Sequence, residues 1–168
     1  MVVTAKYWIE KLSLIKHPEG GYYRETYRSD ILISSDSLPK DYQGQRNSCT
    51  AIYYLLSEAD FSAFHRLKSD EIFHFYSGSP LLVHLIDDQG RYFCQKVGTQ
   101  GQENDILQLV IPRGWWFASE VSEPNSYSLI GCTVSPGFNF NDFELGSREL
   151  LIQMYPNYQD IITRMTYN

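Results

Sequence analysis

The sequence contains little cysteine and no long apolar run, and both shortages exclude whole classes of protein. Only Cys49, Cys94 and Cys132 occur in 168 residues, and all three stand in apolar runs. They form no Cys-x-x-Cys pair, so we predict buried free thiols in a reducing compartment and no catalytic cysteine. No run approaches the roughly 18 apolar residues of a transmembrane helix, and no signal-peptide pattern opens the chain. We expect a cytoplasmic protein that does not bind membranes.

Basic charge is also scarce. The 14 lysine and arginine residues are outnumbered by 20 acidic residues, and the formal net charge is −6. Because nucleic acids and anionic lipids do not attract an acidic protein, we expect no nucleic-acid partner. The phosphate-binding glycine loop, the dinucleotide fingerprint and the serine-hydrolase elbow are absent from the sequence. The partner that we predict is a small molecule.

Aromatic residues are plentiful at 15% and include thirteen tyrosines, which favours a β-rich fold. From Ser48 onward, short alternating runs are separated by turn signals about every ten residues. Such even spacing is typical of a jelly roll or a closed barrel, which protects its own strand edges. We find no linker and predict one domain over residues 1–168, with strands at 48–57, 61–67, 71–77, 80–87, 91–97, 106–112, 115–119 and 126–134.

Other elements flank these strands. Apolar residues at helical spacing after a Thr4 cap predict a helix over residues 4–16. The remaining flanking segments are a strand at 22–28, a long polar loop or flap at 34–47, and short helices at 147–155 and after Pro156. The predicted fold is therefore all-β, with an N-terminal helix and short C-terminal helices.

Two stretches have the pattern of two halves of one pocket. The first, residues 64–78, resembles motif one of the cupin superfamily, in which two histidines, a glutamate and a glycine recur at fixed spacing. His65, Glu71 and Gly78 fit that spacing, but Leu67 stands where the second histidine is expected. One position of the usual metal-binding set is therefore already filled by a residue that cannot bind a metal.

The second stretch, residues 111–117, resembles motif two of the same superfamily. Pro112 and Gly114 fit the Pro-x-Gly pattern, but Phe117 replaces the histidine that follows it. Three further phrases, at residues 17–25, 51–56 and 131–138, are similar to a short single-domain branch, the cupin 5 group. This resemblance implies a cupin barrel, a double-stranded β-helix around a central cavity. It also implies a homodimer and a shape related to the metal-free sugar-nucleotide 3,5-epimerases.

His65 and Glu71 are the candidate catalytic pair. The resemblance implies that both side chains point into the cavity, where a carboxylate would fix the tautomer of the imidazole. Such a histidine is suited to act as a general base near neutral pH. The competing interpretation is a satisfied polar pair in the barrel wall, and the sequence leaves both open.

A metal centre needs three or four convergent ligands, and the sequence offers two. Leu67 and Phe117 cannot bind a metal, and strand alternation places His74 on the face opposite Glu71. We therefore expect no functional metal and no cofactor. His65 and Glu71 remain weak candidates for holding an adventitious ion.

Five residues are candidates for holding a ligand: Tyr22, Arg24, Phe73, Trp116 and Phe117. The planar guanidinium of Arg24 is suited to clamp a carboxylate or phosphate, and an indole facing the cavity would stack on a sugar or base. The alternatives are a surface ion pair for Arg24 and plain packing for the aromatic residues.

These observations predict a cupin barrel that binds a small polar ligand, either a sugar or a nucleotide-linked sugar. One hypothesis adds metal-independent epimerase or isomerase activity through the His65–Glu71 pair. The alternatives are a binder without catalysis and a metal-dependent oxygenase or isomerase. The apolar runs 51–56 and 81–86 predict a homodimer through the outer surface of the barrel.

Overall fold

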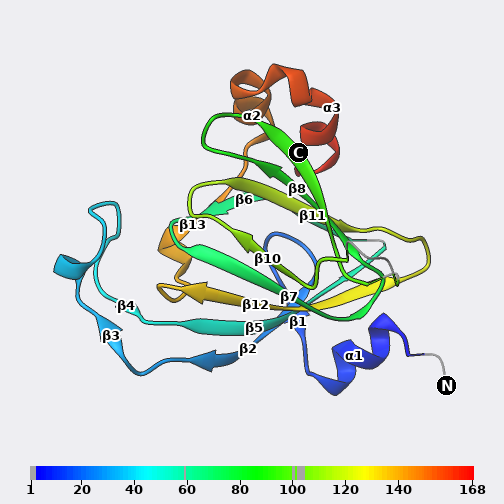
Figure 1. Ribbon diagram of the computed structural model, residues 1–168, viewed down its shortest axis with the longest axis horizontal. Coiled ribbons are helices and arrows are strands. Elements are labelled where there is room, and N and C mark those ends of the chain that lie inside the picture. Colours follow the sequence, from blue (N-terminus) through cyan, green and yellow to red (C-terminus); the bar gives the residue numbers. More distant parts are fainter. Residues whose placement is uncertain (1–2, 59, 100, 102–104) are drawn as a thin grey trace.

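A computed structural model, which describes residues 3–58, 60–99, 101 and 105–168, folds into two facing antiparallel sheets (Figure 1). The first sheet has the strand order β1-β2-β5-β12-β7-β10. Its strands are β1 (Ile15–Lys16), β2 (Tyr22–Arg28), β5 (Thr50–Ser57), β12 (Tyr127–Ser135), β7 (Asp70–Gly78) and β10 (Gln108–Ile111). The second sheet has the order β13-β6-β11-β8-β9. Its strands are β13 (Phe143–Leu145), β6 (Phe61–Leu67), β11 (Trp116–Val121), β8 (Leu81–Ile86) and β9 (Tyr92–Val97).

The predicted all-β fold is confirmed, and strand alternation explains its core. Every second residue of the central strands points between the sheets, because successive side chains leave a strand on opposite faces. Phe73, Phe117 and Ile130 meet there and are at most 4% exposed. Burying a side chain of this size contributes roughly 1.5–3 kcal/mol. The interior of the barrel is thus packed with side chains over much of its length.

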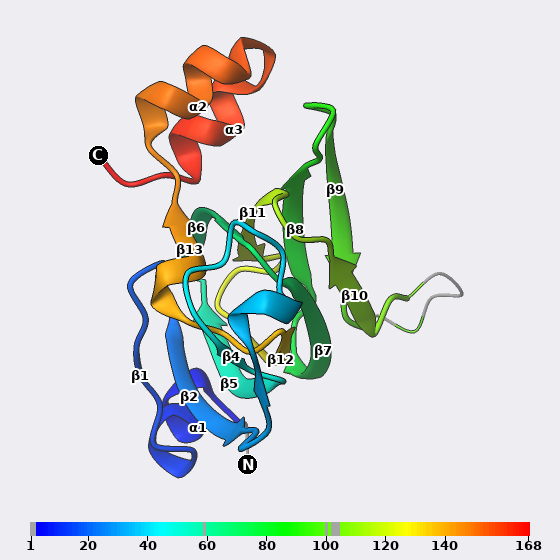
Figure 2. The same cartoon turned by 90° about the vertical axis from the view of Figure 1, so that its left-hand side faces the viewer.

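Helices cover the outer faces of both sheets (Figures 1 and 2). Trp8 of helix α1 (Ala5–Lys11) and the C-cap residue Leu12 pack against the first sheet, beside the buried Leu55. The predicted C-terminal helices are present as α2 (Arg148–Met154), the 3-10 helix η3 (Pro156–Tyr158) and α3 (Gln159–Arg164). They bury Ile86 and Trp116 of the second sheet.

The N-terminal helix is shorter than predicted. Thr4 caps it as expected, since its side chain accepts a hydrogen bond from Tyr7 N. The helix ends at Lys11, however, and Ser13 adopts a left-handed backbone with φ of 51°. Ile15 then pairs with Tyr23 as part of a strand and is 61% exposed. Its helical spacing from Leu12 was therefore coincidental.

The predicted flap at 34–47, hereafter the strap, lies across one end of the barrel (Figure 2). It contains the 3-10 helix η1 (Ser35–Ser37) and strand β4 (Arg46–Asn47), which pairs with β3 (Leu32–Ile33). A buried ion pair holds it down, because Arg46 Nε and Nη2 donate to Asp142 at 2.5 and 2.7 Å. The hydroxyl of Tyr42 also donates to the carbonyl of Lys68. The strap is thus docked by side chains rather than by the main sheets.

Two sequence expectations concern segments outside the core. The cysteines are free, but only Cys132 is buried, whereas Cys49 is half-buried and Cys94 is exposed. The prediction of three buried thiols is wrong for Cys94 because its strand, β9, lies at the edge of the second sheet. Among the described residues, no helix has the length and apolar character needed to cross a bilayer.

Candidate functional site

A polar turn between β1 and β2 enters the end of the barrel. Gly20 has φ of +118°, and a Cβ atom there would lie 1.9 Å from the carbonyl oxygen of Phe61, so no other residue fits without displacing backbone. Tyr54 donates its hydroxyl to the Gly20 carbonyl at 2.8 Å, and Tyr167 donates to the Glu19 carbonyl at 3.0 Å. These contacts place the carboxyl group of Glu19 inside the barrel.

Glu19 lies at the centre of a buried polar cluster. Its Oε2 atom is 3.2 Å from His65 Nε2 and 3.3 Å from His17 Nδ1. Ser62 donates its hydroxyl to Glu19 Oε1 at 3.0 Å, and the other ring nitrogen of His65 lies 2.7 Å from the carbonyl oxygen of Ala63. Both nitrogens of the His65 ring are therefore engaged within the protein.

The carboxylate that contacts His65 differs from the expected one. The sequence motif pairs His65 with Glu71, but the described residues bring Glu19 against the imidazole instead. Glu71 also points into the barrel and is 7% exposed, close enough to Glu19 and Cys132 to interact with both. The difference arises because Glu19 comes from a distant turn that motif spacing does not describe.

Burial changes the protonation of both predicted catalytic groups. It lowers the pKa of His65 from 6.5 to about 4, although the Ala63 carbonyl opposes this shift. It also raises the pKa of Glu71 from 4.5 to about 8, and the negative charge of Glu19 adds to the increase. At neutral pH the imidazole is thus neutral and the Glu71 carboxyl carries a proton.

The residues present do not fit a cupin metal centre. In the described ranges, no group of three or more His, Cys, Asp or Glu side chains is arranged to hold a metal ion. The Phe117 ring lies 4.0 Å from the His65 ring, centroid to centroid, on the side where the motif-two histidine is expected. His74 bonds to Thr133 and Gln108, as its predicted outward face requires. His84 bonds to Tyr92 and Glu120.

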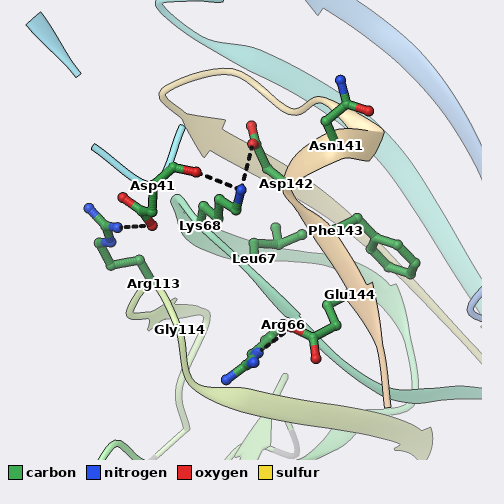
Figure 3. Close-up of a pocket in the computed structure, with 10 residues that line it drawn as sticks. All are labelled: Asp41, Arg66, Leu67, Lys68, Arg113, Gly114, Asn141, Asp142, Phe143 and Glu144. Atoms are coloured by element: carbon green, nitrogen blue, oxygen red, sulfur yellow. Dashed lines mark hydrogen bonds and ion pairs between the residues drawn. The ribbon is translucent and has the colours of Figure 1, made fainter. Parts of the chain in front are cut away.

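A pocket of about 440 Å³ lies beneath the strap (Figure 3). Its lining residues are Asp41, Arg66, Leu67, Lys68, Arg113, Gly114, Asn141, Asp142, Phe143 and Glu144. They come from the strap, the end of strand β6 and the turn after it, the β10–β11 turn, the 3-10 helix η2 (Phe140–Asp142) and strand β13. The pocket is thus a meeting point of segments that are far apart in sequence.

Three cation–carboxylate pairs surround this pocket (Figure 3). Their shortest nitrogen–oxygen distances are 2.8 Å for Arg66–Glu144, 3.9 Å for Lys68–Asp142 and 2.7 Å for Arg113–Asp41. Leu67, which replaces the second motif-one histidine, also lines the pocket. The pocket therefore offers both hydrogen-bond donors and acceptors beside an apolar wall.

Phe143 lies between the pocket and the buried cluster. Phe143 lines the pocket, and the centroid of its ring is 5.4 Å from that of His65 and 6.1 Å from that of His17. A ligand in the pocket is consequently separated from the His65 ring by one aromatic side chain.

The predicted ligand-binding residues fall into two groups. Phe73 and Phe117 point into the barrel and are buried in its core. Tyr22 packs on the outer face toward α1, and Arg24 is exposed two residues further along the same strand. Trp116 also points outward, because it precedes the inward Phe117, and it is buried under the C-terminal helices. The prediction that Tyr22, Arg24 and Trp116 line the cavity is therefore wrong, because strand alternation turns all three outward.

Sequence reasoning did not single out His17, Glu19, Asp41, Lys68 or Asp142. The first two stand in the phrase His17-Pro18-Glu19-Gly20-Gly21, which was used only to recognise relatives. Adjacent glycines beside two ionisable residues were the available signal, since glycines permit a backbone to approach other groups closely. Asp41, Lys68 and Asp142 carried no signal of their own, because they meet only in the folded barrel.

Comparison with known proteins decides the family. Residues 6–146 match the family model Cupin_5, described as Cupin superfamily (DUF985). The chain belongs to this family. The cupin is 32% identical to the uncharacterized protein YML079W of Saccharomyces cerevisiae over 153 residues, which cover 84% of this chain and 76% of the yeast protein.

Two solved structures resemble the cupin over almost its whole length. A hypothetical protein from Leishmania major has a TM-score of 0.88 and 35% identity, covering 99% of this chain and 100% of that one. Protein SO0799 from Shewanella oneidensis has a TM-score of 0.88 and 34% identity, covering 99% of each chain. These comparisons establish the cupin barrel, and the function rests on the site.

Proposed function

We propose that this cupin binds a small, hydroxyl-rich molecule, a sugar or a nucleotide-linked sugar, in the pocket under the strap. The observation that supports the proposal is the mixed lining, in which arginine and lysine donors stand beside carboxylate acceptors around about 440 Å³. A hydroxyl group both donates and accepts, so a sugar satisfies such a lining better than a purely anionic or apolar molecule does. The volume lies within the usual range of small-molecule sites.

The exposed ion pairs at the rim of the pocket are suited to open, so that one partner of a pair binds a ligand instead. The side chains of Arg113 and Asp41 are 41% and 49% exposed, and those of Arg66 and Glu144 are 38% and 55% exposed. Exposed pairs of this kind contribute only about 0–1 kcal/mol each to stability. A ligand that replaces one partner therefore gains a charged hydrogen bond at little conformational cost.

Arg113→Ala is expected to weaken ligand binding, with Arg24→Ala as a matched control. Losing a hydrogen bond to a charged group costs about 1.5–3 kcal/mol, which corresponds to roughly 10- to 100-fold in Kd. Arg24 is exposed on the outer side of the barrel, so its removal is expected to leave binding unchanged. Calorimetric titration with sugars, sugar nucleotides and organic acids provides the measurement. Equal effects of the two substitutions would contradict the proposed site.

Acid–base isomerisation is a second candidate, supported by the protonated Glu71 carboxyl inside the barrel. Burial and the nearby Glu19 raise its pKa to about 8, which is close to what a general acid needs at neutral pH. The contacts of both His65 nitrogens within the protein, with the Ala63 carbonyl and with Glu19, support the binding candidate instead. Deuterium incorporation at a ligand carbon, followed by NMR during the same titrations, favours isomerisation, whereas binding without incorporation favours a pure binder.

We also propose a homodimer through the outer face of the first sheet. The ring centroids of Tyr53 and Tyr76 lie 6.1 Å apart there. Together with Trp8, Leu12 and Leu129, these residues line an apolar hollow of about 270 Å³. Tyr76 is 52% exposed. The other predicted contact run, 81–86, is covered by the chain's own helices at Ile86 and so does not contribute.

Tyr76→Glu is expected to convert the dimer into a monomer, because a charge in the centre of an apolar interface loses its hydration. Light scattering should then report about 19.5 kDa instead of twice that mass. Leu150→Glu is the control, since Leu150 is 60% exposed on α2, far from this face. A wild-type monomer at micromolar concentration would contradict the dimer.

A further inference from the structure

We propose that Lys68 and Arg113 form an anion site in the pocket under the strap, and that the Asp41 carboxylate fills this site until a phosphate group of the ligand replaces it. The inference rests on the proposed binding function and narrows it, because only the nucleotide-linked sugar carries phosphate. Asp41 is then an internal competitor that the strap brings into the pocket.

The ammonium group of Lys68 shares its carboxylate partner with another cation. Asp142 lies 3.9 Å from Lys68 Nζ, but it already accepts two hydrogen bonds from the Arg46 guanidinium. In the described part of the chain, Lys68 forms no other ion pair. Its ammonium has three N–H groups and donates one of them to the backbone carbonyl of Asp41 at 2.7 Å. Lys68 therefore retains positive charge and donors for a ligand.

The Arg113 guanidinium contacts the side chain of the same strap residue (Figure 3). Its Nη2 atom donates to Asp41 Oδ2 at 2.7 Å, and the guanidinium lies 5.6 Å from the centroid of the Tyr42 ring, which helps to position it. Asp70 accepts a hydrogen bond from the backbone N–H of Arg113 at 2.8 Å. Within the described ranges, however, Asp41 is the carboxylate that forms an ion pair with the guanidinium.

The two cations therefore meet at one residue, and this fits a phosphate-bearing ligand. Arg113 contacts the carboxylate of Asp41, and Lys68 contacts its backbone carbonyl. Guanidinium groups bind carboxylate and phosphate in the same bidentate manner, so a phosphate group fits where the Asp41 carboxylate lies. A diphosphate has anionic oxygens on two phosphorus atoms and so reaches Lys68 as well, which binds phosphate as a point charge.

The strap does not depend on the Asp41 carboxylate for its position. The side chain of Asp41 is 49% exposed, so water already reaches the carboxylate. The strap is anchored by the buried ion pair between Arg46 and Asp142. A second anchor is the Tyr42 hydroxyl, which donates to the backbone carbonyl of Lys68. Replacing Asp41 by a ligand phosphate therefore opens an exposed ion pair and leaves both anchors in place.

Opposite effects of two substitutions test the proposal. Asp41→Asn is expected to tighten the binding of inorganic pyrophosphate and of UDP-glucose by about 3- to 10-fold, because it removes the competing negative charge. Lys68→Met is expected to weaken the binding of both by about 10- to 100-fold, the usual loss of a hydrogen bond to a charged group. It keeps the backbone carbonyl that Tyr42 contacts, so the strap stays docked. Calorimetric titration of the full-length protein measures both changes.

Glu144→Gln is the matched control, since Glu144 lines the same pocket but pairs with Arg66. It removes the same charge as Asp41→Asn and is expected to tighten pyrophosphate binding less. Equal tightening by both substitutions would reduce the effect to the general charge of the pocket and would overturn the proposal. Unchanged or weaker binding in Asp41→Asn, unchanged binding in Lys68→Met, or no pyrophosphate binding at all would overturn it as well.

The same titrations, with glucose as an uncharged ligand, separate this proposal from the proposed function. Pyrophosphate binding with the expected effects of both variants, but no binding of any sugar or sugar nucleotide tested, would refute sugar binding and retain the anion site. Equal binding of glucose and UDP-glucose in the wild type and in both variants would support sugar binding and overturn the anion site.

Discussion

Asp142→Ala is expected to destabilise the protein by about 3–5 kcal/mol, the usual cost of leaving one member of a buried ion pair unpaired. Asp142 and Arg46 have side chains only 3% exposed, and two charge-assisted hydrogen bonds join them. Removing the carboxylate leaves the buried guanidinium with only the backbone carbonyls of the strap as acceptors. Urea unfolding monitored by tryptophan fluorescence measures the change in the free energy of unfolding.

Two controls define what this result means. Glu10→Ala removes an exposed pair with Lys6 and is expected to change stability by less than about 1 kcal/mol. The double variant Arg46→Met with Asp142→Leu removes both charges, so it is expected to recover most of the loss. If Asp142→Ala behaved like Glu10→Ala, the strap would not be anchored by this pair. Because Asp142 also lines the pocket, the strap and the ligand site depend on the same carboxylate.

Glu71→Gln is expected to make the protein more stable at mildly alkaline pH and to flatten its pH dependence. The pKa of Glu71 rises from 4.5 to about 8 on folding, so the folded state holds a proton that the unfolded state has lost. The stability that Glu71 contributes is therefore fully present below pH 4.5 and is lost as the pH rises toward about 8. The loss is at most about 1.4 kcal/mol per pH unit. The full effect is of order a few kcal/mol. Glutamine carries no such penalty.

The contribution of His65 to stability changes with pH in the opposite direction. Its pKa falls from 6.5 to about 4, so its contribution is present above 6.5 and is lost as the pH falls toward 4. The two groups together place their joint optimum between 4.5 and 6.5. Denaturant unfolding of wild type and Glu71→Gln from pH 4.5 to just above 8 tests the prediction. Parallel curves for the two proteins would show that Glu71 is not held protonated.

Local patterns predicted much of the fold. The strand at 61–67 coincides with β6 and the strand at 22–28 with β2, because alternation and turn residues act over a few neighbours. The predicted N-terminal helix was too long, because residue spacing alone does not reveal the left-handed backbone of Ser13. Both the correct strand bounds and the error in the helix length reflect interactions between residues close together in the sequence.

The candidate site was predicted only in part. Motif spacing indicated that His65 and Glu71 both lie inside the barrel, and both are buried there. It could not indicate that Glu19 contacts His65, since that contact depends on a turn that enters the barrel from another part of the chain. Motif spacing also could not predict that Asp41 pairs with Arg113, because the strap docks through side chains that meet only after folding.

The order of amino acids settles the family, the strand pattern and the loss of two metal-binding histidines to Leu67 and Phe117, since these are properties of single positions and their spacing. Folding alone determines which carboxylate meets His65, which tryptophan faces outward and which charges close the pocket. The reason is that burial and hydrogen bonding depend on distances between atoms. Residues remote in the chain acquire such distances only when the barrel closes around them.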